Sequence, residues 1–159
     1  MKLYFVRHTS AADNAATDSK RPLTRQGEEE ARRVGAALSG LNVRPSRIYS
    51  SPLLRARQTA DLIASELGFD GPTESLDELA NGATTSSLIK ALSPTSDETI
   101  LVGHMPSLAE HVAAIVGAKS PAEFTFGKGS VACIELVRPK LSAGKLQWLR
   151  HLPQLTPVH

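Results

Sequence analysis

Short apolar runs alternate along this chain with longer stretches in which apolar residues recur every three or four positions. The short runs predict buried strands over 2–6, 46–50, 99–104, 130–137 and 145–152. The run at 99–104 has no polar residue in its interior, which is typical of a parallel strand covered on both faces. The last two runs are joined by 139–144 and predict a hairpin at the edge of a sheet.

The longer stretches predict amphipathic helices over 23–40, 51–68 and 106–117. Their expected buried stripes are Ala31, Val34, Leu38 and Leu41; Ala56, Ala60, Ile63 and Leu67; and Leu108, Val112 and Ile115. Thr24 is expected to cap the first helix. Ser51 is expected to cap the second, with Pro52 at its first helical position. Gly40 and Gly68 are expected to stop these two helices.

The order of these elements predicts an α/β fold. Residues 69–97 are polar and rich in Gly, Pro, Ser and Thr, and they add one short helix near 85–92. Strands that alternate with helices favour parallel pairing, because parallel neighbours need a long crossover connection. We therefore expect a single domain over 1–159, with a mostly parallel central sheet flanked by helices on both faces and a C-terminal edge hairpin.

Composition narrows the range of partners. The net charge of the 159 residues is +2 and aromatic residues make up 4%, which argues against a nucleic-acid-binding surface. No apolar stretch is long enough to span a bilayer, and the first apolar run stops at Arg7 before a signal peptide could form. We expect a cytoplasmic protein with neither nucleic-acid nor membrane partners.

Basic side chains follow the ends of the predicted parallel strands. Arg7 and His8 follow the first strand, His104 ends the third, and Arg55 lies one turn into the helix after the second. Ligands of open parallel sheets bind beyond the carboxyl ends of the strands. Two histidines and two arginines at one rim suit a phosphoryl group, because guanidinium forks match phosphate oxygens and a neutral imidazole is a competent nucleophile.

Other interpretations of these residues stay open at this point. An arginine–histidine pair at the end of a single strand is more often exposed to solvent than catalytic. A zinc site needs a third and usually a fourth ligand, and no H-x-x-x-H, C-x-x-C or H-E-x-x-H spacing occurs, so we predict no metal and no other cofactor. Cys133 is expected in the core, whereas His111, His151 and His159 are expected on the surface or without partners.

Four motifs, in this order, carry a family resemblance. They are VRHTS at 6–10, RPLTRQGEEEA at 21–31, SSPLLRARQTA at 50–60 and VGHMPSL at 102–108. Together they resemble the histidine phosphatase superfamily, which includes the cofactor-dependent phosphoglycerate mutases, and they cover roughly residues 2–116. The short chain and Arg21 look most like the compact SixA-type phosphohistidine phosphatases. The resemblance therefore implies a phosphoglycerate mutase-like fold.

The resemblance also implies roles for single residues. His8 matches the nucleophile that becomes phosphohistidine, and Arg7 and Arg55 match the arginines that clamp the phosphate. His104 matches the second pocket histidine, which hydrogen-bonds the phosphoryl group and stabilises its transition state. Arg21 matches an additional phosphate-binding arginine of SixA-type members.

Three positions depart from the family pattern or match it incompletely. Thr9 replaces the glycine that usually follows the Arg–His pair, and it fits if its φ is negative. Asn14 stands where mutase-like members place a phosphate-contacting asparagine, although an asparagine in a turn explains it equally well. Glu78 is the best match to the glutamate general acid of many relatives, although SixA-type members need not use one.

Together these observations predict a metal-independent phosphatase that passes through phospho-His8. Its expected substrate is phosphohistidine on a phosphorelay or phosphocarrier protein. The alternatives are a phosphatase of small phosphorylated substrates and a catalytically weak module that binds phosphorylated ligands. The presence of both His8 and His104 favours an enzyme, because a binding module needs arginines but no nucleophile. A mutase is disfavoured, because the chain lacks the length that holds a bisphosphate while it reorients.

Overall fold

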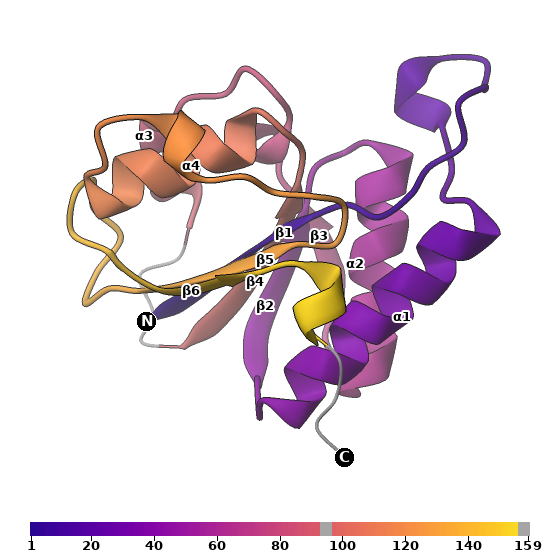
Figure 1. Ribbon diagram of the computed structural model, residues 1–159, viewed down its shortest axis with the longest axis horizontal. Helices are drawn as coiled ribbons and strands as arrows, with labels where there is room; N and C mark the ends of the chain where they lie inside the picture. The colour runs from indigo at the N-terminus through magenta and orange to yellow at the C-terminus, as the bar shows by residue number, and fades with distance from the viewer. Residues whose placement is uncertain (93–96, 156–159) are drawn as a thin grey trace.

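One sheet organises the computed structural model, which describes residues 1–92 and 97–155 (Figure 1). Within these ranges six strands lie in the order β3-β2-β4-β1-β5-β6. Their bounds are β1 Lys2–Arg7, β2 Pro45–Ser50, β3 Thr73–Ser75, β4 Glu98–Gly103, β5 Val131–Glu135 and β6 Lys145–Arg150. Strand β4 pairs in parallel with both β1 and β2, and β2 pairs in parallel with β3. Strand β5 pairs antiparallel with both β1 and β6. This topology confirms the mostly parallel sheet and the C-terminal edge hairpin.

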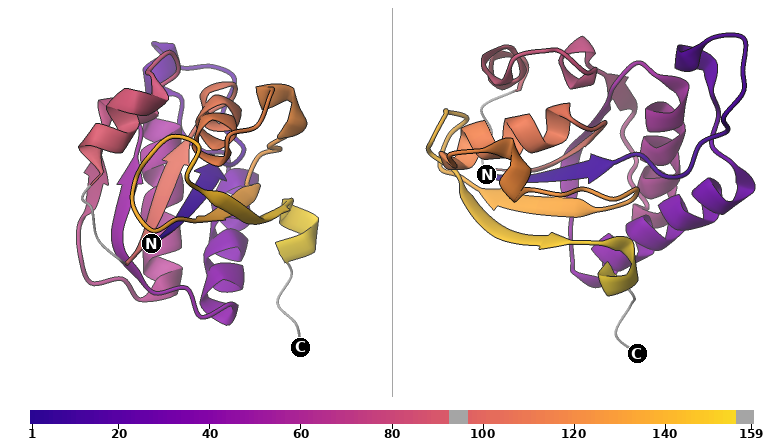
Figure 2. Two further views of the ribbon diagram at one scale, coloured as in Figure 1. Left: turned by 90° about the vertical axis from the view of Figure 1, so that its left-hand side faces the viewer. Right: turned by 45° about the horizontal axis from the view of Figure 1, so that its top comes forward.

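Helices cover both faces of the sheet, as predicted (Figure 1). Their bounds are α1 Arg25–Gly40, α2 Leu54–Leu67, α3 Thr85–Ala91 and α4 Ser107–Val116. Short 3-10 turns are η1 Asp18–Lys20, η2 Asp77–Leu79, η3 Pro121–Glu123 and η4 Leu152–Leu155. Figures 1 and 2 show the loop that carries η1 reaching beyond the ends of α1 and α2.

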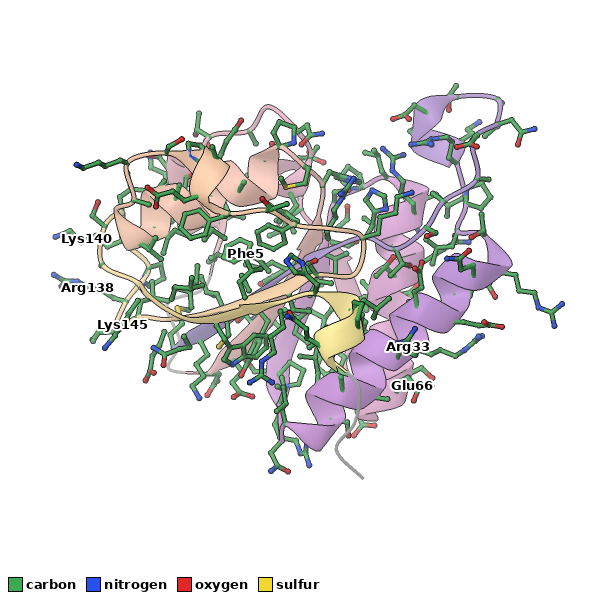
Figure 3. All side chains as sticks on the ribbon, in the orientation of Figure 1. Phe5, Arg33, Glu66, Arg138, Lys140 and Lys145 are labelled. Carbon is green, nitrogen blue, oxygen red and sulfur yellow. The ribbon has the colours of Figure 1, made fainter. Side chains whose placement is uncertain are left out.

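Strand β1 shows why two helical layers form. Its side chains alternate between the faces of the sheet. Leu3 and Phe5 pack into the core under α3 and α4, and Figure 3 shows Phe5 in that layer. Tyr4 and Val6 pack into the core under α1 and α2. Because both faces are apolar and buried, the strand needs cover on each side.

Helix α1 has the start and the end that the sequence predicted, but its buried stripe is shorter than expected. The Oγ1 of Thr24 accepts a hydrogen bond from Gly27 N at 3.0 Å, so the predicted cap is confirmed. Gly40 is the last residue of α1, as expected. Leu41 lies outside the helix with an exposed fraction of 44%, so its assignment to the buried stripe was wrong. The apolar stripe of α1 therefore ends at Leu38, which is fully buried.

The start of α2 was also predicted wrongly. The helix begins at Leu54, with Leu53 as its N-cap residue, and Pro52 precedes it. The hydroxyl of Ser51 accepts a hydrogen bond from Leu53 N at 3.3 Å but does not cap the helix. The expected end at Gly68 is confirmed, because Gly68 adopts the left-handed conformation with φ of 64°. The hydroxyl of Ser51 is therefore available to bond to His104.

The connection between α2 and β4 holds a strand that the sequence did not predict. The expected short helix near 85–92 is confirmed as α3. Strand β3, at the edge of the sheet, was missed, because three residues with polar side chains carry no apolar period. Part of this connection, residues 93–96, lies outside the described residues.

The prediction for His111 was wrong and that for His151 only in part, since His151 has a partner but is not buried, whereas the one about cysteine is confirmed. Cys133 is buried in the core under α1 and α2. His111 is buried in α4, where its Nδ1 lies 2.8 Å from Thr85 Oγ1. The Nδ1 of His151 lies 2.7 Å from Ser130 Oγ. His159 lies outside the described residues.

A close approach between α1 and the loop after β1 requires glycine at position 27. A Cβ atom on Gly27 would collide with the carbonyl oxygen of Ser10, whereas one on Gly40 would find no atom within 4 Å. Gly27→Ala should therefore lower the free energy of unfolding by about 1–3 kcal/mol, the usual cost of overpacking. Gly40→Ala is the matched control and should leave stability equal or slightly higher, because alanine favours helix.

Urea denaturation of both variants measures the difference directly. An unfolding midpoint for Gly27→Ala equal to that of the unmodified chain would contradict the proposed contact between α1 and Ser10.

Candidate active site

The ends of β1 and β4 place two histidines side by side. The register pairs Arg7 with Gly103, so the residues that follow these strands emerge at the same level. His8 N donates to Gly103 O at 3.0 Å, which continues the pairing past the end of β1. The ring centroids of His8 and His104 are 5.0 Å apart, with the planes tilted by 52°. The convergence expected from strand ends is thus present.

The hydrogen bond of His8 determines which ring nitrogen carries the proton. Its Nδ1 lies 2.8 Å from the carbonyl oxygen of Thr9. Because a carbonyl oxygen can only accept a hydrogen bond, the proton of the neutral ring resides on Nδ1. The Nε2 of His8 therefore carries a lone pair.

Burial keeps both imidazoles neutral. Burial, assisted by the positive charges of Arg55, Arg7 and Lys128, lowers the pKa of His8 to about 4. Burial, assisted by the neighbouring His8, lowers the pKa of His104 to about 3. A neutral His8 has the free electron pair that a nucleophile requires.

Ser51 positions the ring of His104. Ser51 Oγ lies 2.5 Å from His104 Nε2 and accepts a hydrogen bond from Leu53 N at 3.3 Å. Because the amide of Leu53 donates to this oxygen, we assign the hydroxyl hydrogen of Ser51 to the bond with Nε2. In that arrangement the proton of His104 resides on Nδ1, which turns this nitrogen into a donor.

The two arginines are held by backbone carbonyls. Arg7 donates from one terminal nitrogen to Phe126 O at 2.8 Å. Arg55 donates to Asp18 O at 2.9 Å and forms an ion pair with the carboxylate of Asp18 at 3.2 Å. Arg55 is buried at the start of α2, and Asp18 belongs to the η1 loop. Each guanidinium is therefore fixed at its terminal nitrogens.

Three buried nitrogens of the site lack a partner among the described residues. They are Nε of Arg7, Nε of Arg55 and Nδ1 of His104. A buried polar atom without a hydrogen bond costs about 1–3 kcal/mol, so native proteins rarely leave one unsatisfied without reason. All three nitrogens belong to residues that surround His8. Their missing partner is therefore expected to be a ligand rich in acceptors.

Arg21 is joined to this cluster through Asp18. Its Nε forms an ion pair with the carboxylate of Asp18 at 3.0 Å, and a terminal nitrogen donates to Ala12 O at 3.2 Å. Asp18 thus bridges Arg21 and Arg55, and hydrogen bonding to Arg55 lowers the pKa of its carboxyl group. The structure brings together Arg7, His8, Arg55 and His104, with Arg21 one ion pair away.

The two uncertain candidates lie apart from the four central residues. Asn14 is exposed on the loop before η1, and its side chain bonds to no described residue. Glu78 is half-buried in η2, and its carboxylate likewise bonds to no described residue. The next residue, Leu79, nevertheless approaches Gly103 with its carbonyl oxygen, so η2 lies beside the end of β4.

Sequence reasoning missed three contributors to the site. Ser51 was assigned to a helix cap, which is the usual role of a serine before proline and a helix. Asp18 carried no signal except its spacing of three residues from Arg21. Thr9 contributes through its backbone carbonyl, which no side-chain pattern reveals.

The described residues hold no group of three or more histidine, cysteine, aspartate and glutamate side chains that could bind a metal ion. Among the same residues, no helix is both long and apolar enough to cross a membrane.

Comparison with known proteins establishes the family. The model of the histidine phosphatase superfamily (branch 1) matches residues 3–87. Phosphohistidine phosphatase SixA of Escherichia coli is 34% identical over 79% of this chain and 80% of its own length. An uncharacterized protein of Picosynechococcus is 42% identical over 72% of this chain and 73% of its own length.

A solved structure of the protein histidine phosphatase SixA complexed with tungstate superposes with a TM-score of 0.85. The two chains are 27% identical, and the match covers 98% of this chain and 100% of the other. This chain therefore belongs to the histidine phosphatase superfamily and is a phosphatase with the fold of SixA, as its motifs predicted.

Because three histidines are buried as neutral imidazoles, the free energy of unfolding should depend on pH. The pKa values of His8, His104 and His111 in the folded protein are lowered to about 4, 3 and 4, against about 6.5 in an unfolded chain. Between these values the unfolded state binds more protons, so the free energy of unfolding should fall as the pH falls from about 6.5 toward 4. Urea midpoints at pH 7.5 and 5.5 measure this fall.

The matched control is His111→Gln, which removes one titrating group outside the site. Its stability should change less between the two pH values than that of the unmodified chain. An unfolding midpoint that stays constant from pH 7.5 to 5.5 would contradict the burial of neutral imidazoles.

Proposed function

We propose that this phosphatase hydrolyses phosphohistidine on a phosphorelay or phosphocarrier protein of the cytoplasm, without a metal, through a phospho-His8 intermediate. The observation that carries the proposal is the set of three unpartnered buried donors around a histidine whose Nε2 holds a lone pair. A phosphoryl group has three peripheral oxygens, and it supplies the acceptors that Arg7, Arg55 and His104 lack.

In the first step, the lone pair on Nε2 of His8 attacks phosphorus. The new bond joins Nε2 to phosphorus while the bond from phosphorus to the substrate imidazole breaks. The electron pair of the broken bond stays on the substrate nitrogen, and a proton on the distal nitrogen lets the product leave as neutral imidazole. Arg7, Arg55 and His104 stabilise the charge on the phosphoryl oxygens in the transition state.

In the second step, water attacks phosphorus and loses a proton to the solvent. The bond to Nε2 of His8 breaks, and its electron pair returns to the ring. Because Nδ1 keeps its proton, which is hydrogen-bonded to the carbonyl of Thr9, His8 leaves as a neutral imidazole. The products are inorganic phosphate and the original enzyme.

The leaving group supports phosphohistidine over an alkyl phosphate as the substrate. An imidazole with a proton on its distal nitrogen leaves without further help, whereas an alkoxide needs a general acid. The carboxylate of Glu78 bonds to no described residue and lies on η2, beside rather than within the cluster of four. The similarity to the phosphohistidine phosphatase SixA supports the same choice.

A phosphatase of small phosphorylated substrates is the second candidate. The half-buried Glu78, beside the end of β4, is the one observation that favours it, because such an enzyme needs an acid. A purely binding module is disfavoured, because binding alone does not require an imidazole held as a buried nucleophile.

A substrate panel with trapping of the phosphoenzyme tests the proposal. Phosphohistidine protein should be hydrolysed with a much higher kcat/KM than sugar phosphates, and EDTA should leave the rate unchanged. Quenching during turnover should trap a label that is stable in alkali and labile in acid, and His8→Ala should carry none. A labelled His8→Ala protein, or an EDTA loss that zinc or magnesium restores, would refute the mechanism.

Glu78→Gln separates the two substrate classes. Phosphohistidine hydrolysis should barely change, whereas any slow hydrolysis of alkyl phosphates should fall about tenfold or more, the usual scale of a lost general acid. Asp77→Asn, which neutralises the exposed neighbouring carboxylate on η2, is the matched control. Measurement of kcat/KM on both substrates decides, and a collapse of phosphohistidine hydrolysis in Glu78→Gln would make Glu78 the acid of the main reaction.

A further inference from the structure

Thr9 stands where the family usually has glycine, and its side chain is fully buried. Among the described residues other than glycine, only Asn42 and Ser142 have a positive φ, so the backbone at Thr9 accepts a β-branched residue without strain. Resting on the proposed role of His8, we propose that Thr9 is a positioning residue whose hydroxyl fixes the carbonyl that keeps the proton on Nδ1 of His8.

The polar groups of Thr9 attach the loop to both neighbouring helices. Its hydroxyl donates to Gly27 O in the first turn of α1 at 2.7 Å. Its backbone N–H donates to Thr59 Oγ1 of α2 at 3.2 Å. Its carbonyl oxygen accepts from Nδ1 of His8 at 2.8 Å. Thr9 thus joins the nucleophile to α1 and α2 at once.

The partner hydroxyl on α2 is itself fixed. Thr59 Oγ1 donates to the carbonyl of Arg55, one turn earlier, at 2.8 Å. Each threonine hydroxyl has one hydrogen, and both hydrogens are committed to these shorter bonds. The 3.3 Å contact between the two hydroxyl oxygens is therefore a packing contact rather than an additional hydrogen bond. The hydroxyl of Thr59 thus bonds to both the backbone N–H of Thr9 and the backbone carbonyl of Arg55.

The orientation of the key carbonyl is fixed at both ends of its peptide unit. The carbonyl of Thr9 and the N–H of Ser10 belong to the same planar peptide. Ser10 N donates to the carboxylate of Glu30 on α1 at 3.0 Å, on the opposite side from the bond to His8. The hydroxyl of Thr9 then prevents this unit from sliding along α1, because it binds Gly27 O.

This carbonyl has a chemical role as well as a steric one. If the proton of His8 moved to Nε2, the lone pair that attacks phosphorus would be lost. After transfer of the phosphoryl group, the ring carries a positive charge, and the same carbonyl stabilises it through the Nδ1 proton. A small displacement of the carbonyl therefore affects both chemical steps but not substrate binding.

Thr9→Val tests the hydroxyl, because it replaces the hydroxyl by a methyl group of similar size. We expect kcat on phosphohistidine to fall about tenfold or more, within the range known for misplacement of a catalytic group, with KM nearly unchanged. Thr9→Ser keeps the hydroxyl and should retain kcat within about threefold of the unmodified chain, which is small on the same scale. Thr99→Val, a change at a buried threonine near the opposite end of the β1–β4 pair, is the matched control.

A spectrum separates this proposal from the proposed function. Histidine labelled with ¹⁵N reports which ring nitrogen carries the proton without any substrate, and His8→Gln assigns the signal of His8. Thr9→Val should populate the tautomer protonated on Nε2, whereas Thr9→Ser should keep the proton on Nδ1. If Thr9→Val fails to fold, Thr9→Gly, which also lacks the hydroxyl, takes its place.

Two results would overturn the proposal. One is an unchanged tautomer and kcat in the variant that lacks the hydroxyl. The other is a loss of kcat in Thr9→Ser as large as in that variant, since the serine keeps the donor. Failure of the proposed function looks different, because the unmodified chain would then show the Nδ1 tautomer without hydrolysing phosphohistidine.

Discussion

The parallel pairing of β1 with β4 is the constraint on which the active site depends. Backbone hydrogen bonds fix the register from Lys2 and Glu98 to Arg7 and Gly103. The residues that follow, His8 and His104, have no freedom to separate, because His8 N still bonds to Gly103 O. A shift of one residue would turn the buried side chains of β1 toward the wrong helices, so the packing of both cores protects the geometry of the site.

Burial then gives the arginines and histidines different charges. A buried imidazole is easily held neutral, because its pKa lies near 6.5 in water. A guanidinium stays charged under the same burial, because its pKa is far above neutrality. One environment therefore supplies both an uncharged imidazole and permanent positive charge, and the sequence needs only the correct residue type at each position.

Much of this arrangement was predictable from the sequence. Arg7, His8 and His104 could be placed because strand ends are local, and the apolar period that marks a strand also marks where it stops. Arg55 was placed from its position shortly after β2, although α2 begins at Leu54 and not at Pro52 as the sequence suggested. Ser51 and Asp18 could not be placed, because their partners lie 53 and 37 residues away and no periodic pattern encodes such contacts. His111 was misjudged for a related reason, since burial on α4 depends on α3, which packs over it.

The ion pair between Asp18 and Arg55 has a consequence for what the pocket retains. Because the same carboxylate also pairs with Arg21, the free site contains its own counter-charge. Two bare guanidinium groups beside His8 would hold any small dianion strongly, inorganic phosphate included. The carboxylate weakens that attraction while leaving Nε of Arg55 unpaired. In a phosphatase, this internal counter-charge favours release of the phosphate product over its retention.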